Sequence, residues 1–145
     1  MTRILLDTDV ILDLFFDREP FSQDTAKILS FCESNQIEAY VTPIVISNVY
    51  YLLRKTASHI QVITQLRLLM SIVHVLEVSK ETILDAISSS FKDFEDALQN
   101  YAAESAGLID VIVTRNVKDY KQSALSIQTP DAFLKTISDV FFGNR

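Results

Sequence analysis

Side chains whose oxygens can hold a cation recur along the chain. Asp7 directly follows the short apolar run Arg3–Leu6. Asp93 and Asp96 stand three residues apart, a spacing that puts both on one side of a helix. Hard divalent cations prefer carboxylate oxygens, and a buried carboxylate is costly unless a positive charge compensates it. These residue types therefore indicate a divalent-cation site.

The segment GLIDVIVTRNVKDY, residues 107–120, adds further oxygen donors. Asp110 precedes its apolar run, Thr114 ends the run, and Asn116 and Asp119 follow it. Thr and Asn supply neutral oxygens to a metal or hydrogen-bond a carboxylate that binds one. Asn and Asp also favour turns at strand ends, so the alternative of turn chemistry stays open.

Each acidic group also has an interpretation in which it only stabilises the start of a helix. Asp7 is a preferred capping residue, with Asp9 as a second candidate, and this segment alone favours the cap. Asp93 and Asp96 likewise suit the positive N-terminus of a helix. Asp96 nevertheless adjoins a face of small apolar residues that predicts its partial burial, namely Ala97, Leu98, Ala102 and Ala103.

Strand-like and helical patterns alternate along the chain. Strands are predicted at residues 3–6, 37–42, 73–78, 110–114 and 125–129, and helices at 9–17, 22–35, 43–55, 60–72, 80–91, 94–107 and 130–140. This order predicts an α/β fold of three α/β/α layers around a mainly parallel sheet of four to five strands. Sites in such folds lie beyond the carboxyl ends of the strands, where Asp7 and residues 113–116 are expected.

Length and composition bound the remaining possibilities. The 145 residues, 48% of them hydrophobic, predict a single domain over residues 1–145. No membrane span is expected, and the lone Cys32 favours a reducing, cytoplasmic location. The net charge of −6 opposes a nucleic-acid surface made of Lys and Arg. Carboxylates gathered for a metal also make a chain acidic, so charge does not exclude a metal-dependent enzyme.

Four segments in this order resemble the PIN-domain family. They are LLDTDVILD, TPIVISNVYYLLRK, DFEDALQ and DVIVTRN, and the resemblance runs from about Arg3 to Leu134. Within the family the chain is most similar to bacterial toxins of the VapC type. The resemblance implies a PIN-like fold and a metal-dependent endoribonuclease that hydrolyses RNA phosphodiester bonds.

The resemblance also implies which residues form the site. PIN domains place four acids around one or two Mg²⁺ or Mn²⁺ ions, and Asp7 and Asp96 match the first and third. The second and fourth acids fall at Asn48 and Asn116, which are amides and should weaken the hold on the metal. Four further acids are candidates to restore negative charge nearby: Asp9, Asp93, Asp110 and Asp119.

Partners follow from the same resemblance. Single-stranded or structured RNA is the expected substrate, contacted by Thr8, Thr114, Arg115 and Lys118. For Arg54 and Lys55 the pattern favours a solvated helix end instead. A homodimer and a cognate antitoxin are implied.

Two other functions remain open. One is a PIN-fold module that binds RNA or protein with little or no cutting, which the amides at Asn48 and Asn116 favour. The other is a phosphotransfer or phosphatase-like domain, which needs a nucleophilic Asp with a matching Lys. No such Lys is evident for LLDTDV.

Overall fold

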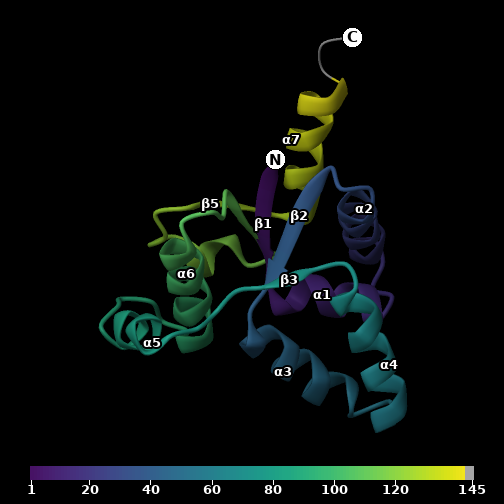
Figure 1. Cartoon of the computed structure of the whole chain (residues 1–145), viewed down its shortest axis with the longest axis horizontal. Coiled ribbons are helices and arrows are strands. Elements are labelled where there is room, and N and C mark those ends of the chain that lie inside the picture. Colours follow the sequence, from purple (N-terminus) through teal and green to yellow (C-terminus); the bar gives the residue numbers. More distant parts are fainter. Residues whose placement is uncertain (143–145) are drawn as a thin grey trace.

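A five-stranded sheet forms the centre of the molecule in the computed structural model, which describes residues 1–142 (Figure 1). Its strands are β1 (Thr2–Leu6), β2 (Ile37–Val41), β3 (His74–Val75), β4 (Val111–Val113) and β5 (Ser126–Gln128). They lie in the order β3-β2-β1-β4-β5, and every neighbouring pair is parallel. The predicted α/β class and parallel sheet are confirmed.

Helices cover both faces of the sheet. Within residues 1–142 they are α1 (Thr8–Phe15), α2 (Phe21–Glu33), α3 (Pro43–Leu53), α4 (His59–Met70), α5 (Lys80–Ile87), α6 (Phe94–Ala106), α7 (Pro130–Phe142) and a 3-10 helix at Val117–Tyr120. α5 and α6 lie on one side of β1 and β2, and α1 to α4 lie on the other (Figure 1). No helix in the described part of the chain is both long and apolar enough to cross a membrane.

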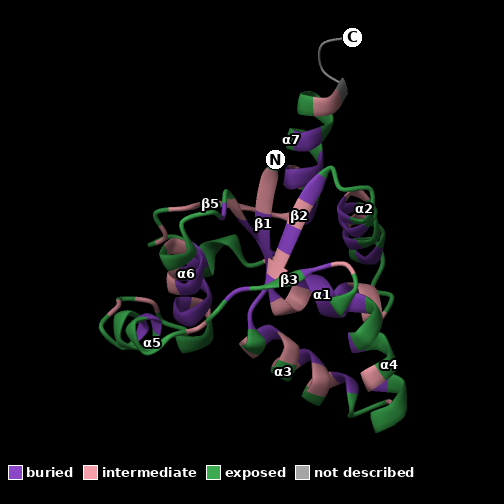
Figure 2. Cartoon of the chain, in the orientation of Figure 1, coloured by how far each residue is buried: buried purple, intermediate pink, exposed green. Residues whose placement is uncertain are grey.

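Alternating side chains of β1 bind the two helical layers to the sheet. Ile4 and Leu6 are fully buried in the larger core with α1 to α4 and α7, whereas Leu5 belongs to a second core with Ile112 and Ala103. Figure 2 shows buried residues along the central strands and on the helix sides that face them. A strand buried on both faces is what a parallel sheet requires.

The helix starts follow the capping chemistry expected from the sequence. Thr42, Ser79 and Asp93 each accept a hydrogen bond from the first turn of α3, α5 and α6. Gly107 ends α6 in the left-handed conformation, with φ of 68°, which residues with a Cβ adopt at a cost. These caps fix where each site-bearing helix begins.

Some predicted boundaries are wrong. The strand expected at residues 73–78 is reduced to the exposed edge pair His74–Val75, because the buried residues Val73 and Leu76 stand three positions apart and break the alternation of a strand. α3 ends at Leu53 and α5 at Ile87, short of the predicted 55 and 91, because helical periodicity does not mark where the final turn frays.

Candidate functional site

The strand order places one pocket at the carboxyl ends of β1 and β4. The chain leaves β1 toward β2 on one side and reaches β4 on the other, which makes this pair the switch point where α/β folds form sites. A pocket of about 550 Å³ lies there. Its lining includes six acids, two cations and three amides: Asp7, Asp9, Asp93, Glu95, Asp96, Asp119, Arg18, Lys55, Asn48, Gln99 and Asn116.

Asp7 is a buried carboxylate of the pocket, with 8% of its surface exposed. Its Oδ1 accepts from the Thr8 N–H at 2.8 Å and from Gln99 Nε2 at 3.4 Å. Its Oδ2 accepts from the Thr114 hydroxyl at 3.0 Å and the Tyr120 hydroxyl at 3.1 Å. Asp7 therefore caps α1 and also reaches α6, β4 and the 3-10 helix, so capping and a site role coexist.

Asp96 lies beside Asp7 and shares a donor with it. The Tyr120 hydroxyl stands 3.1 Å from Asp7 Oδ2 and 3.2 Å from Asp96 Oδ1. A phenol carries one proton, so it can donate to only one of the two carboxylates at a time. Partial burial, and then the charges of Asp7 and Asp93, raise the pKa of Asp96 to about 7. Burial beside the two acids also raises the pKa of Tyr120, which stays a neutral donor.

Asn48 contacts Glu95, an acid that the sequence analysis did not identify as a candidate site residue. Its Nδ2 donates to Glu95 Oε2 at 2.9 Å, joining α3 to the first turn of α6. Glu95 is exposed and lines the same pocket. A carboxylate is thus present next to the amide at 48.

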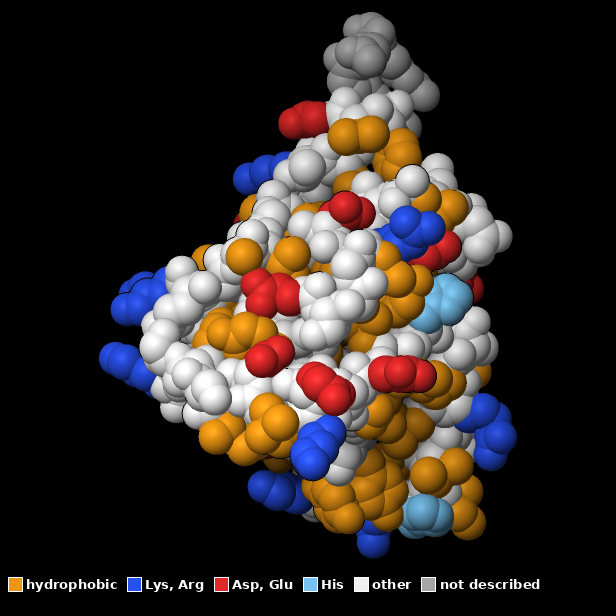
Figure 3. Space-filling view, turned by 60° about the vertical axis from the view of Figure 1, so that its left-hand side comes forward, with side chains coloured by type: hydrophobic (Ala, Val, Ile, Leu, Met, Phe, Trp, Pro, Cys, Tyr) orange, Lys and Arg blue, Asp and Glu red, His pale blue; other side chains and the backbone are white. Residues whose placement is uncertain are grey.

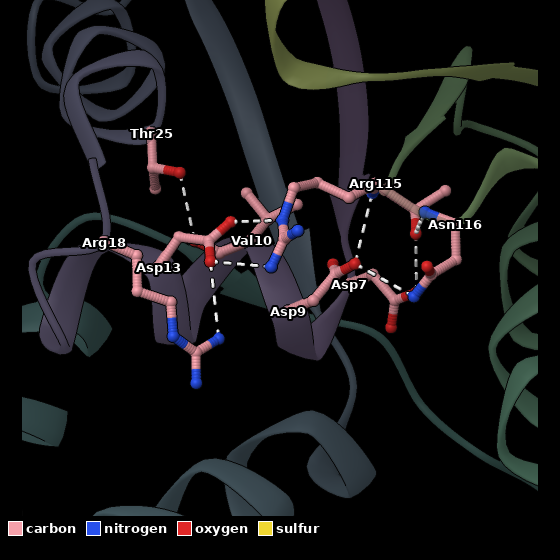
Figure 4. Close-up of polar contacts among 9 residues, drawn as sticks. Asp7, Asp9, Val10, Asp13, Arg18, Thr25, Arg115 and Asn116 are labelled. Carbon is pink, nitrogen blue, oxygen red and sulfur yellow. Dashed lines mark hydrogen bonds and ion pairs between the residues drawn. The ribbon is translucent and has the colours of Figure 1, made fainter. Parts of the chain in front are cut away.

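Asn116 is paired with an acid in the same way. Its Nδ2 donates to Asp9 Oδ2 at 3.2 Å, and the Arg115 N–H donates to that oxygen at 3.2 Å (Figure 4). Asp9 Oδ1 is buried and accepts no hydrogen bond from the described residues. Burial, and then the charge of Asp7, raise the pKa of Asp9 to about 6.

A buried ion pair holds the loop that carries Asn116 against α1. Asp13 is fully buried and accepts from Arg115 Nε at 2.7 Å and Arg115 Nη2 at 3.0 Å (Figure 4). The Arg115 guanidinium also lies 4.2 Å from the centre of the Phe21 ring. The guanidinium of Arg115 binds Asp13, and Arg115 is not among the described residues that line the pocket; that it contacts substrate stays a prediction.

Five other predicted site residues lie in the pocket or next to it. Thr8, Asp93 and Asp119 line the pocket, and Thr114 is buried behind Asp7, where its hydroxyl holds that carboxylate. Lys118 lies in an adjoining cavity that shares Asp93 and Asp119 with the pocket.

Asp110 lies at the opposite end of the sheet. Its Oδ2 accepts from the Arg3 N–H at 2.9 Å, beside the start of β1. The expectation that Asp110 adds charge near the site is wrong, because it precedes β4 and the site follows β4.

Several pocket residues escaped the sequence analysis. Gln99 stands three residues after Asp96 on α6, a helical spacing that places it on the same side. Lys55 is exposed just after the end of α3, as expected, and it also lines the pocket. Arg18 lines the pocket from the α1–α2 turn. Tyr120 has no local signal, because its two partners lie 113 and 24 residues away in the chain.

The donor set of the pocket suits a hard divalent cation such as Mg²⁺ or Mn²⁺, because its donors are carboxylate and amide oxygens. The buried, unpaired Asp9 Oδ1 and the proton shared between Asp7 and Asp96 are both features that a cation would satisfy. Among residues 1–142, however, no three His, Cys, Asp or Glu side chains are arranged to hold a metal ion on their own. Amide oxygens or water would have to complete the coordination.

The sequence identifies the family. The model of the PIN domain family matches residues 3–118, so the chain belongs to this family. None of the curated proteins compared matches the chain.

Solved structures similar to the chain include VapBC proteins and a VapC toxin. VapBC2 of Rickettsia felis, bound to a DNA fragment from its promoter, has a TM-score of 0.67 at 14% identity, over 88% of this chain and 98% of that one. VapBC-1 of nontypeable Haemophilus influenzae has a TM-score of 0.65 at 20% identity, over 90% and 99%. Mycobacterium tuberculosis VapC20, a toxin that cleaves the sarcin–ricin loop, has a TM-score of 0.59 at 16% identity, over 75% and 86%. At these identities the likeness establishes the fold.

The partial burial of Asp96, and then the acids beside it, predict a pH-dependent gain in stability for Asp96→Asn. The folded-state pKa of Asp96 is about 7, above its unfolded value near 4, so the wild-type chain loses stability as pH rises from about 4 through 7. At pH 8 in EDTA, we expect the variant to unfold with a free energy higher by about 1–2 kcal/mol, discounted for solvent screening. At pH 4 the difference should vanish. Urea unfolding at both pH values measures it, and an equal effect at pH 4 and pH 8 contradicts it.

The buried Asp13–Arg115 pair predicts a large loss of stability for Asp13→Ala. This variant leaves a mostly buried guanidinium without its carboxylate, which should lower the free energy of unfolding by about 2–3 kcal/mol. Glu38→Ala is the matched control, because it breaks the more exposed Arg3–Glu38 pair, whose distance is 2.9 Å. Urea unfolding at pH 7 compares the two, and equal losses would refute the role of burial.

Proposed function

We propose that the chain is a metal-dependent endoribonuclease that hydrolyses RNA phosphodiester bonds at this pocket. The observation that carries the proposal is the convergence of Asp7 and Asp96 on one hydroxyl at the β1–β4 switch point. Membership in the PIN domain family and the likeness to VapC20 support the reaction class.

Asp7 and Asp96 would hold the cation, and Asn48 and Asn116 would orient water or complete its shell. When bound, Mg²⁺ or Mn²⁺ supplies an activated water and neutralises charge that builds on the phosphate. Thr114, Gln99 and Tyr120 fix the Asp7 carboxylate in position, which limits the reorganisation that the reaction requires. Asp9 and Glu95, each bonded to one of the amides, return negative charge to the two positions where PIN domains usually carry acids.

Cleavage of a mixed single-stranded RNA pool in Mg²⁺ or Mn²⁺ tests this proposal. Asp7→Asn and Asp96→Asn should each lower the rate on the order of 100-fold or more, because ligand loss costs at least as much as loss of a supporting residue. Asp110→Asn, at the far end of the sheet, should cut like the wild type. A folded wild type that cuts nothing across both metal series, or an Asp7→Asn variant that cuts at the wild-type rate, would reject it.

The alternative function is a PIN-fold module that binds RNA or protein without cutting. The amides at Asn48 and Asn116 favour it, because neutral oxygens hold Mg²⁺ less strongly than carboxylates. A Mg²⁺ titration separates the two functions: the nuclease should bind the ion at millimolar concentration or below, whereas a binding module need not.

We further propose that the chain forms a homodimer and pairs with a cognate antitoxin. Support comes from the similar proteins solved as VapBC complexes and from a cavity of about 320 Å³ between α1, α3 and α4, lined in part by Phe15, Phe16, Leu53 and Val62. Light scattering at micromolar concentration should give twice the 16.4 kDa chain mass. A mass of one chain at that concentration would remove the dimer from the proposal.

A further inference from the structure

One side of α3 runs along the pocket. Ile44, Asn48, Tyr51 and Leu52 of α3 line it, and so does Lys55, two residues beyond the end of the helix. With a helical rise of about 1.5 Å per residue, Tyr51 lies about 5 Å beyond Asn48 along the axis, and Lys55 follows in the turn after the helix. An amide, an aromatic ring and an ammonium group therefore follow one another away from the acids.

Tyr51 is an exposed aromatic ring that is held in place. Its exposed fraction is 68%, high for so large an apolar surface. The ring of Tyr50 meets it edge to face, with centroids 5.1 Å apart and an interplanar angle of 84°. The Tyr50 hydroxyl is itself bonded to His59 Nδ1 at 2.9 Å. Such bracing reduces the ordering cost when a flat ligand stacks on the ring.

Two cations are among the described residues that line the pocket, Lys55 and Arg18. Lys55 is exposed just beyond the end of α3, four residues after Tyr51, and Arg18 keeps 44% of its side chain exposed while lying 3.4 Å from Asp13 Oδ1. Of the six acids in the lining, Glu95 contacts Asn48, at the other end of this row from Lys55, and acidic side chains also lie close together across one face of the molecule (Figure 3). A phosphate chain is therefore attracted at the Lys55 end of the row and repelled by the acids.

We propose that Tyr51 is a stacking platform for an unpaired nucleobase next to the cleaved phosphate, with Lys55 contacting a flanking phosphate. The inference deepens the proposed nuclease function and rests on it. A protein surface is the competing use of Tyr51, but an ammonium group one turn from the ring and metal-type donors one turn before it match a nucleotide better. Bases in a duplex already stack on one another, so the substrate must have an unpaired base at this position.

Binding of a fluorescein-labelled 12-nucleotide single-stranded RNA of mixed sequence tests the platform. Fluorescence anisotropy of the full chain is measured in Ca²⁺, which oxygen ligands also accept. Tyr51→Ala should weaken binding about tenfold, and Tyr51→Phe and Tyr51→Trp should retain it, because the ring and not the hydroxyl supplies the stacking. Lys55→Ala should weaken binding and reduce its salt dependence by about one phosphate contact, and Lys55→Arg should restore both.

Matched controls separate this effect from general damage. Leu68→Ala removes an exposed apolar side chain from α4, and Lys80→Ala removes an exposed cation from α5, and both lie outside the pocket. Neither should change the affinity. The same RNA annealed to its complement should bind wild type and Tyr51→Ala equally. Wild-type affinity of Tyr51→Ala for the single strand would overturn the platform and leave Tyr51 to a protein partner.

Measuring binding and cleavage separately distinguishes failure of the stacking platform from failure of the nuclease proposal. If the wild type cleaves RNA and Tyr51→Ala binds and cleaves equally well, the platform is refuted and the nuclease stands. If the wild type cleaves nothing but binds single strands through Tyr51, the nuclease is refuted and the stacking site stands on a binding module. A loss in cleavage that follows the loss in affinity supports both.

Discussion

A single buried carboxylate, that of Asp7, joins the parts of the fold that make the pocket. Burying a charge is unfavourable unless donors surround it, and Asp7 draws its donors from α1, α6, β4 and the 3-10 helix. Gln99, one of these donors, also accepts a hydrogen bond from Thr42, the cap of α3. The start of α3 is therefore connected to Asp7 through Gln99 of α6. The order of the strands makes this meeting possible, because β1 is central and its carboxyl end faces the switch point.

The chemistry of the pocket is set by how negative charge is distributed around this point. Two carboxylates share one phenol proton, and each of the two amides is bonded to a further acid. On the proposed function, Glu95 and Asp9 supply the negative charge that the resemblance to PIN domains implies for positions 48 and 116. Burial, and then the charges of Asp7 and Asp93, disfavour the ionised form of Asp96 and raise its pKa. A bound cation would offset both effects.

Local pattern was sufficient for most of the fold and for part of the site. The short apolar run of β1 and capping residues such as Thr42 and Asp93 predicted the elements, and the structure brings Asp7 and Asp96 together in one pocket. Asp110 was expected near the site because it is close in sequence to Thr114 and Asn116. It precedes β4, however, and therefore lies at the opposite end of that strand from the residues that follow it. The pairing of Arg115 with Asp13 was not predicted, because the two residues are 102 positions apart in the chain. Side-chain pairs between residues so far apart in the chain cannot be predicted from local residue spacing.

The overall acidity of the chain, which opposed an RNA substrate at first, acquires a different meaning in the folded protein. Of the 13 Lys and Arg residues, two line the pocket, against six acids. On the proposed function, phosphate approaches a site whose charge repels it until a cation is bound, so RNA affinity is linked to metal affinity through the same carboxylates. The two cations are too few to hold RNA by charge alone, which makes contacts to the bases necessary. Tyr51, exposed and braced beside Lys55, is the pocket residue whose chemistry suits such a contact.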